Sequence, residues 1–229
     1  MKRCKLTAAV CGAFVILSMS ITATASATLT PEFMQHGKPI GSINFEGTAG
    51  GIALETKAFK VVCFSSTTKG SASATSVSKV VIKWADCEEA GGFHSSCTTH
   101  GDFSGEIVSE SLKGRLGGIN SSPDEVGLLL EAEAGLSTPV TSFECSTLSG
   151  SIHDQVIGLL EPLKVEQEEF GLFYTCKGAG TQTLTLFEKE TEPHNLVFFY
   201  PSLEKEALCL TSKGTYLWKP SGTKVEIHP

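Results

Sequence analysis

The sequence predicts an all-β protein, either an antiparallel β-sandwich or a barrel-like fold, stapled by disulfide bonds. Three observations predict this class. Short alternating or contiguous apolar runs recur between Gly, Ser, Thr and Pro residues along the chain. Helical periodicity is scarce. Six cysteines follow a segment with the pattern of an export signal, and cysteines in an oxidising compartment form disulfides.

Residues 1–27 are predicted to be a signal peptide. Lys2, Arg3 and Lys5 precede an apolar stretch, and Ala25-Ser-Ala27 fits the small-x-small site of a signal peptidase. A membrane anchor is the alternative, but Ser and Thr residues dilute the second half of the stretch. No later segment reaches the ~20 apolar residues that a span requires. We therefore expect cleavage near Ala27, no transmembrane segment in the mature chain, and a secreted or cell-surface location.

Composition and charge exclude several classes of protein. The 229 residues are 41% hydrophobic and 19% charged, which argues against a disordered chain or a charged coiled coil. The full chain has 18 Lys+Arg against 25 Asp+Glu. Without the leader the count becomes 15 against 25, a formal charge of −10. That field repels nucleic acid, so no nucleic-acid partner is expected.

Beyond the leader, residues 28–39 are interpreted as an N-terminal extension and residues 40–229 as a single β-rich domain. The domain has an internal echo, because Gly51-Ile-Ala-Leu-Glu-Thr-Lys-Ala58 resembles Gly127-Leu-Leu-Leu-Glu-Ala-Glu-Ala134 and each run leads to a cysteine. Two similar half-units, 40–120 and 121–229, are therefore one possible organisation; chance similarity of glycine-bounded strands is the other.

The first predicted element is a short turn at 30–32, with Thr30 as N-cap and Pro31 at the first helical position. Strands are then predicted wherever period-two or β-branched runs stand between turn residues. Their ranges are 41–46, 51–54, 60–64, 78–85, 105–109, 112–116, 125–130, 141–145, 151–157, 170–176, 181–187, 195–199, 207–210, 215–218 and 224–227. The core is expected to include Phe45, Val62, Val81, Trp84, Ile107, Leu129, Phe143, Ile152, Phe173 and Phe198.

The mature chain carries an even set of cysteines, which predicts three disulfides: Cys63, Cys87, Cys97, Cys145, Cys176 and Cys209. Closeness in sequence favours Cys87–Cys97. The two cysteines of the C-terminal third, Cys176 and Cys209, are expected to pair, which leaves Cys63 with Cys145. The internal echo supports that last pair, because equivalent cysteines of two half-units could meet near a pseudo-twofold axis.

Metal and catalytic signals are weak. His94, Cys97 and His100 with Cys87 upstream have zinc-type spacing, but disulfide formation would remove both thiols, so no metal and no cofactor are expected. A glycosidase needs two carboxylates, and no pair stands out among Asp102, Glu106, Glu110, Glu131, Glu133, Glu166, Glu168 and Glu169. Ser151 and His153 lie close in sequence without a nucleophile elbow. Catalytic residues therefore stay unassigned.

Aromatic residues supply the candidate binding positions. Trp218 and Tyr216 are the candidates for stacking against a sugar. Phe93, in the loop between Cys87 and Cys97, is the candidate for contact with a protein.

Several short motifs follow one another in a characteristic order: Gly41-Ser-Ile-Asn-Phe45, Val61-Val-Cys63, Cys97-Thr-Thr-His-Gly101, Gly127-Leu-Leu-Leu130, Phe143-Glu-Cys145 and Gly150-Ser-Ile152. Through them the chain resembles, over residues 40–165, a family of secreted, uncharacterised β-rich proteins of soil actinobacteria. The resemblance implies export and a β-rich fold, and it carries no activity or catalytic residue.

Three functional classes follow. The preferred one is a non-catalytic extracellular binding or surface-structural module, whose ligand is a glycan or a protein. The alternatives are a secreted glycoside or ester hydrolase, using an acid pair or a Ser/His site, and an extracellular effector or inhibitor of another protein.

Overall fold

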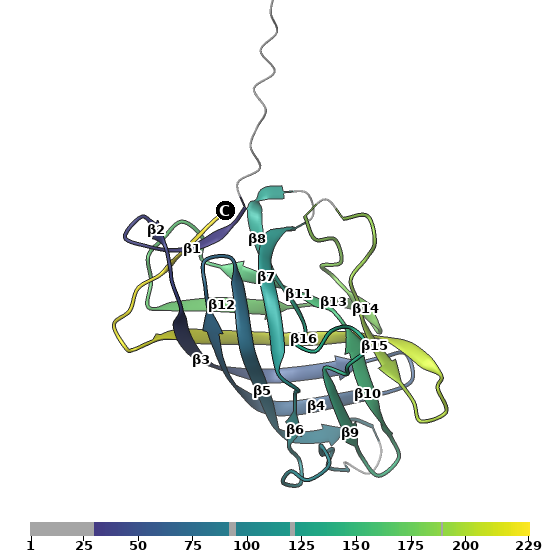
Figure 1. The fold of residues 1–229 in the computed structure, drawn as a ribbon. Helices are drawn as coiled ribbons and strands as arrows, with labels where there is room; N and C mark the ends of the chain where they lie inside the picture. The colour runs from purple at the N-terminus through teal and green to yellow at the C-terminus, as the bar shows by residue number, and fades with distance from the viewer. Residues whose placement is uncertain (1–29, 92–94, 120–121, 189) are drawn as a thin grey trace, which may run out of the picture.

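The computed structural model describes residues 30–91, 95–119, 122–188 and 190–229 (Figure 1). The predicted signal peptide therefore lies outside the described residues. Strands dominate the described part of the chain and no helix occurs in it, so the predicted all-β, antiparallel fold is confirmed. In these ranges nothing forms a helix of the length and apolarity that a membrane crossing requires.

The strands range in length from 2 residues to 15. In chain order they are β1 (Glu32–Gln35), β2 (Lys38–Pro39), β3 (Ile43–Glu55), β4 (Lys60–Ala72), β5 (Ser76–Glu89), β6 (Ile107–Val108), β7 (Leu112–Ile119), β8 (Ser122–Ala132), β9 (Thr141–Glu144), β10 (Ser149–Asp154), β11 (Val156–Glu161), β12 (Glu169–Tyr174), β13 (Cys176–Gly178), β14 (Thr181–Gln182), β15 (Leu196–Phe199), β16 (Lys205–Lys219) and β17 (Glu226–His228).

Eight of these strands close into an antiparallel barrel. The hydrogen-bonded order is β3, β4, β5, β7, β8, β11, β12 and β16, and β16 pairs with both β12 and β3. Each barrel strand therefore lies beside the barrel strand that comes next in the chain, and the last one returns to the first. Closure satisfies the backbone groups along both edges of every strand in the ring. Of the two predicted architectures, the barrel is the one found.

Both ends of the barrel are covered (Figure 1). At one end β1, β2 and β17 form a small sheet. Phe33 from this sheet is fully buried and packs with its ring centroid 5.3 Å from that of Trp218. At the other end β9, β10 and β15 continue the sheet from the first residues of β16. Phe198 is fully buried there, and its ring centroid lies 5.7 Å from that of Phe143.

Glycines inside the strands make room for the aromatic residues that fill the barrel. A Cβ built on Gly47 would overlap the ring of Tyr216, and one built on Gly70 would meet Phe45 at 2.6 Å. In sequence these glycines look like turn residues, so the prediction divided two long strands. The predicted strands 41–46 and 51–54 are one strand, β3, and 207–210 and 215–218 both belong to β16. Conversely, the predicted strand 151–157 is two strands, which separate at Asp154, where φ is 71°.

The predicted core is largely correct, but three of its members face outward. Val81 is 39% exposed, and Val62 and Phe173 are half-buried on the outer surface. Their neighbours Val61, Val80 and Leu172 occupy the interior instead. A strand with apolar residues on both faces does not reveal which set points inward, and a shift of one residue exchanges them. The turn expected at 30–32 is also wrong, because strand β1 begins at Glu32.

Candidate functional site

The barrel interior leaves almost no room for a ligand. A cavity of about 20 Å³ lies between residues that include Leu54, Trp84 and Tyr174, and another of about 10 Å³ lies beside Phe45 and Tyr174. The larger cavity has about the size that one water molecule needs. Burial raises the pKa of Tyr174 well above its ordinary value of 10.0, and its hydroxyl has no hydrogen-bond partner among the described residues. The interior is a packed core, so a binding site is to be sought on the outer surface.

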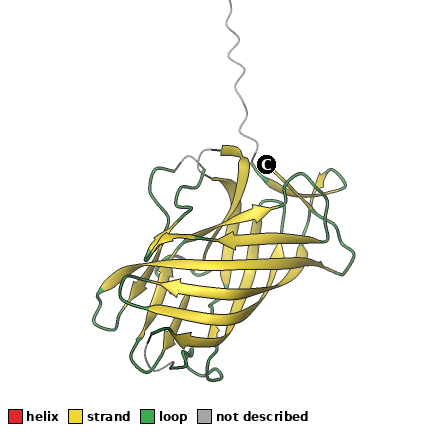
Figure 2. Cartoon of the chain, turned by 180° about the vertical axis from the view of Figure 1, so that it is seen from behind, coloured by secondary structure: helices red, strands yellow, loops and turns green. Residues whose placement is uncertain are grey.

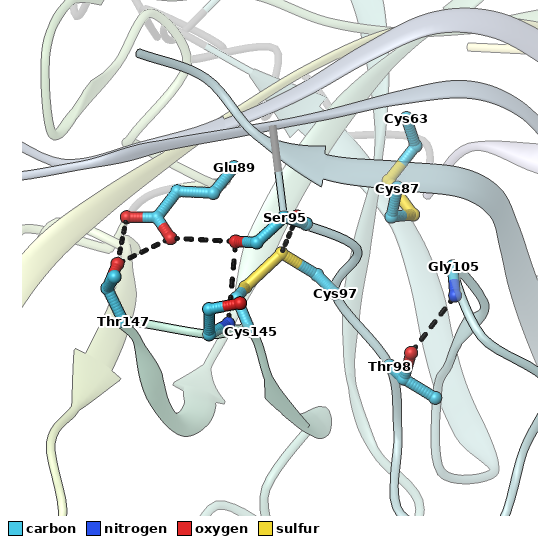
Figure 3. The surroundings of a disulfide bond; sticks show 10 residues. Cys63, Cys87, Glu89, Ser95, Cys97, Thr98, Gly105, Cys145 and Thr147 are labelled. Atoms are coloured by element: carbon cyan, nitrogen blue, oxygen red, sulfur yellow. Dashed lines mark hydrogen bonds between the residues drawn. A yellow bond between two sulfur atoms is a disulfide. The ribbon is translucent and has the colours of Figure 1, made fainter. Parts of the chain in front are cut away.

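In the described residues three disulfides link Cys63 to Cys87, Cys97 to Cys145 and Cys176 to Cys209, and Figure 3 shows the first two. The third pair is the one expected from sequence. The first joins directly opposed residues of β4 and β5, with Cα atoms 4.0 Å apart. The second ties the segment after β5 to the end of β9, where Thr98 forms a bridge with Glu144.

The expected pairs Cys87–Cys97 and Cys63–Cys145 are therefore wrong, although Cys87 and Cys97 do lie side by side. The amide of Cys97 donates to the carbonyl of Cys87 at 2.9 Å. Their side chains nevertheless have different partners, because Cys87 faces Cys63 across the β4–β5 pair. The sequence did contain a signal for this pair: Cys63 and Cys87 are equally distant from Thr75, so a β4–β5 hairpin centred at Thr75 places them opposite each other.

Two phenylalanines stand nearly free in solvent close to the Cys63–Cys87 disulfide. Phe64 is 72% exposed and Phe103 is 78% exposed. Phe64 follows Cys63 in β4, and Phe103 lies in the turn before Gly105, whose carbonyl accepts from the amide of Cys87 at 2.8 Å. Strand β5 thus lies between the backbone of Phe64 and the segment at Gly105, which are separated by two strand spacings, or roughly 10 Å. We call Phe64 and Phe103 the aromatic patch.

Phe64 is exposed because three strands bend at the same level. Gly50 pairs with Ser65, and Ser65 pairs with Ala85. At this level each strand places two consecutive residues away from the core, namely 50–51 in β3, 64–65 in β4 and 85–86 in β5. Positive φ angles at Gly51 (63°) and Asp86 (53°) accompany the bend. Such irregularities re-aim side chains, and here they direct Phe64 outward.

The turn that carries Phe103 is held by hydrogen bonds on both of its arms. The amide of Gly105 donates to Oγ1 of Thr98 at 3.0 Å (Figure 3). The amide of Thr99 donates to the carbonyl of Glu106 at 2.9 Å, and Val108 donates to Oγ1 of Thr99 at 3.0 Å. Together with the Cys97–Cys145 disulfide, these bonds fix the position of Phe103 relative to β5.

The surroundings of the aromatic patch are polar, and the lysine nearest to Phe103 is paired with a carboxylate. Nζ of Lys83 lies 2.8 Å from a carboxylate oxygen of Glu106 and 5.9 Å from the centroid of the Phe103 ring. Next to it, Thr67, Thr48 and Thr215 are register partners across β4, β3 and β16. Their side chains are exposed on this side of the barrel, where the long strands run side by side (Figure 2).

The carboxylate of Glu89 braces the segment that precedes Cys97. Oγ1 of Thr147 lies 2.6 and 2.7 Å from the two oxygens of Glu89, and the hydroxyl of Ser95 donates to the same carboxylate at 3.2 Å (Figure 3). These contacts join the end of β5 to the β9–β10 turn. These hydrogen bonds thus hold together the same regions that the Cys97–Cys145 disulfide links covalently.

A second polar cluster lies over β7, where residues 183–188 and 190–195 cross the outer face. We call this segment the strap. Phe187 is fully buried over Gly117, and the guanidinium carbon of Arg115 lies 4.6 Å from its ring centroid. Arg115 also donates to Glu188 at 2.8 Å and to Glu190. Partial burial opposes ionisation of Glu190, but hydrogen bonds from Arg115 and His194 outweigh it and lower its pKa.

Ser151 and His153 lie on one face of β10, and Oγ of Ser151 is 2.9 Å from Nε2 of His153. Residues two apart in a strand share a face, so the extended backbone of β10 brings these two side chains together. No carboxylate among the described residues is hydrogen-bonded to His153, whose ring instead packs 4.8 Å from that of Phe199. The pair thus lacks the third group that orients the histidine in a catalytic triad.

The other candidates from sequence are dispersed. Glu106 is bonded to Lys83, Glu131 to Lys113 and Glu166 to His36, so these acids occupy separate ion pairs. Over the described residues no group of three or more His, Cys, Asp and Glu side chains could hold a metal ion. His94 and Phe93 lie outside the described residues.

Trp218 and Tyr216, the expected sugar-stacking residues, are 2% and 5% exposed. They belong to the inward set of β16 and pack in the barrel core, so this expectation is wrong. Among the described residues the exposed aromatic ones are Phe64 and Phe103, which sequence reasoning missed. Only the local bend and the held turn make them exposed, and neither is visible as a pattern of residues.

Comparison with known proteins gives no match to this chain, whether against family models, curated proteins or solved structures. The functional argument therefore rests on the sequence and on the geometry of the molecule.

Proposed function

We propose that the chain is an exported, non-catalytic binding or surface-structural module that contacts its ligand through the outer surface of a filled barrel. The observation that carries this proposal is the aromatic patch. Two phenylalanines stay more than two-thirds exposed while more than forty other apolar side chains are buried. Exposed aromatic residues are enriched at recognition sites, where burial against a partner releases the water around them.

The frame beneath the patch supports recognition further. Disulfides and backbone hydrogen bonds hold both phenylalanines in place before any ligand arrives. A preorganised surface loses little conformational entropy on binding, so more of the contact free energy contributes to affinity.

Three disulfides support an extracellular location, because cytosolic thiols are kept reduced. The leader pattern of residues 1–27 points the same way. The mature charge of −10 argues against nucleic acid as the partner.

The experiment combines an array with a turnover assay. The oxidised protein is applied to an array of glycans and extracellular proteins and is incubated in parallel with polysaccharide, ester and peptide substrates. The proposal expects binding without turnover. Turnover that Ser151→Ala or His153→Ala abolishes, with the melting curve unchanged, would establish the hydrolase alternative instead. A blank array would also contradict a binding role.

A further inference from the structure

We propose that the aromatic patch binds a neutral polysaccharide, with Phe64 and Phe103 stacking against sugar rings. This inference rests on the proposed function and names the ligand class for the same surface. It differs from the sequence expectation, which assigned sugar stacking to Trp218 and Tyr216, both of which are buried.

The two rings suit a ligand that is apolar on its faces and polar around its rim. Phenylalanine faces pack against the C–H groups of a sugar, while the sugar hydroxyls need hydrogen-bond partners at the edge of the contact. Ser65 adjoins Phe64 in β4, and Thr67 lies two residues further on the same strand. Both side chains are exposed, so a sugar stacked on Phe64 finds hydroxyl groups within reach.

Charge favours a neutral polymer over an acidic one. The lysines around the patch are matched by carboxylates: Lys83 with Glu106 at 2.8 Å, Lys60 with Glu55 at 3.1 Å and Lys69 with Glu46 at 3.5 Å. The exposed acids Asp86 and Asp102 also lie beside the patch, so the surface offers no excess positive charge to an acidic polymer. The excess negative charge of the whole chain, −7 before removal of the leader, opposes the approach of a polyanion.

The size of the patch argues against a protein partner or a second copy of the chain. A phenylalanine side chain buries about 150–250 Å², so the exposed parts of Phe64 and Phe103 together supply roughly 300 Å². A stable protein interface buries about 800 Å² on each partner and has a contiguous apolar centre. Here the neighbours are threonines, serine and paired lysines. Two separated rings on a polar surface match successive sugars of one chain better than a protein surface.

The test measures retention of the oxidised protein on cellulose, chitin, xylan and mixed-linkage β-glucan, by pull-down and by affinity electrophoresis. Three variants are compared with the parent: Phe64→Ala, Phe103→Ala and the control Leu203→Ala. Leu203 is 84% exposed in the turn before β16, so the control removes an equally free apolar side chain from another place. Since all three positions are exposed, melting curves should coincide with that of the parent.

The proposal expects the parent to bind at least one of these polysaccharides. Each phenylalanine variant should weaken apparent affinity by about tenfold or more, as expected for a hot-spot residue, and Leu203→Ala should leave it unchanged. Retention on none of the four polymers, or equal retention by all variants, would overturn the inference. Loss of a protein ligand in the phenylalanine variants, with no polysaccharide bound, would also overturn it while leaving the proposed binding function in place.

Discussion

Gly47 shows how single residues decide the packing of this barrel. It lies in β3 beneath the ring of Tyr216, and a Cβ at this position would overlap that ring. Tyr216 is 5% exposed and stacks on Phe170 with ring centroids 5.1 Å apart, so its ring is held by close neighbours. The glycine is therefore needed for its lack of a side chain, and this need could not be read from the sequence without knowing which strand pairs with β3.

Gly47→Ala should destabilise the protein by about 1–3 kcal/mol, because overpacking forces the Tyr216 ring and its neighbours to shift. Gly50→Ala is the matched control in the same strand. A Cβ on Gly50 has its nearest neighbour at 3.6 Å, an ordinary contact, so the change in stability should stay within about 0.5 kcal/mol. Urea unfolding with the disulfides intact measures both, and equal midpoints for the two variants would refute the packing described.

At the scale of single residues, the sequence predicted which side chains are apolar but not which face they occupy. Tyr216, Leu217 and Trp218 are consecutive and bulky, yet only Leu217, at 45% exposure, points outward. Alternation alone predicts two equivalent registers for such a run. The barrel selects one of them by packing Trp218 against Phe33, a residue almost 200 positions away in the chain.

Among the elements, the strap is the clearest case of a segment whose sequence misled. Residues 181–187 alternate like a strand, but only Thr181 and Gln182 form one, in β14. The remainder lies over the outer face of β7, where Phe187 forms a bridge with Ile119. Apolar and polar residues alternate there because one side of the segment packs on the outside of the barrel. The same alternation is typical of a strand in a sheet, so the local sequence does not distinguish the two.

The strap should loosen in acid. The pKa of Glu190 is lowered from its ordinary 4.5 in the folded state, so its contribution is complete above about pH 4.5 and is lost as the pH falls through the lowered value. The charged and hydrogen-bonding groups facing it are Arg115, Glu188 and His194, with Gln155 behind His194. Exposed ion pairs contribute at most about 1 kcal/mol to stability. The rate of amide hydrogen exchange in the strap, corrected for the intrinsic effect of pH, should therefore rise by up to about fivefold.

Hydrogen exchange at pH 6 and pH 3 measures this effect. In Glu190→Gln the strap should exchange faster than in the parent already at pH 6, and its further acceleration between the two pH values should be smaller. If the parent strap showed the same corrected exchange at both pH values, the assigned role of Glu190 would be refuted.

For the whole molecule, the sequence predicted the class of fold and the presence of many antiparallel strands, but not the closure of the barrel. Closure depends on the pairing of β16 with β3, for example of Trp218 with Phe45. Nothing local specifies a partner at that separation, since register between distant strands is set by packing of the shared interior. The same limit explains why the half-unit echo suggested a disulfide, Cys63–Cys145, that the register does not allow.

The filled interior has a consequence for alkaline pH. Burial is the main cause that raises the pKa of Tyr174, Tyr200 and Tyr216 above the ordinary 10.0, and for Tyr200 the hydrogen bond to Glu206 adds to it. A raised pKa means that the neutral phenol is favoured by the fold. The associated stability is therefore present below pH 10 and is lost as the pH rises through the folded values.

Tyrosinate absorbance near 295 nm should thus lag behind that of a free tyrosine derivative in the native protein and should match it in denaturant. The half-buried Tyr200 is expected to titrate before Tyr174 and Tyr216, which should ionise only as the barrel unfolds. All three tyrosines titrating near pH 10 in the native protein would show that solvent reaches the interior.

The placement of the aromatic patch depends on the register of β4 against β5, in which Cys63 faces Cys87. Peptide mapping of the unreduced protein by mass spectrometry tests that register most directly. The account predicts linked peptides for Cys63–Cys87, Cys97–Cys145 and Cys176–Cys209. A linked peptide joining Cys87 to Cys97, or free Cys63, would contradict it.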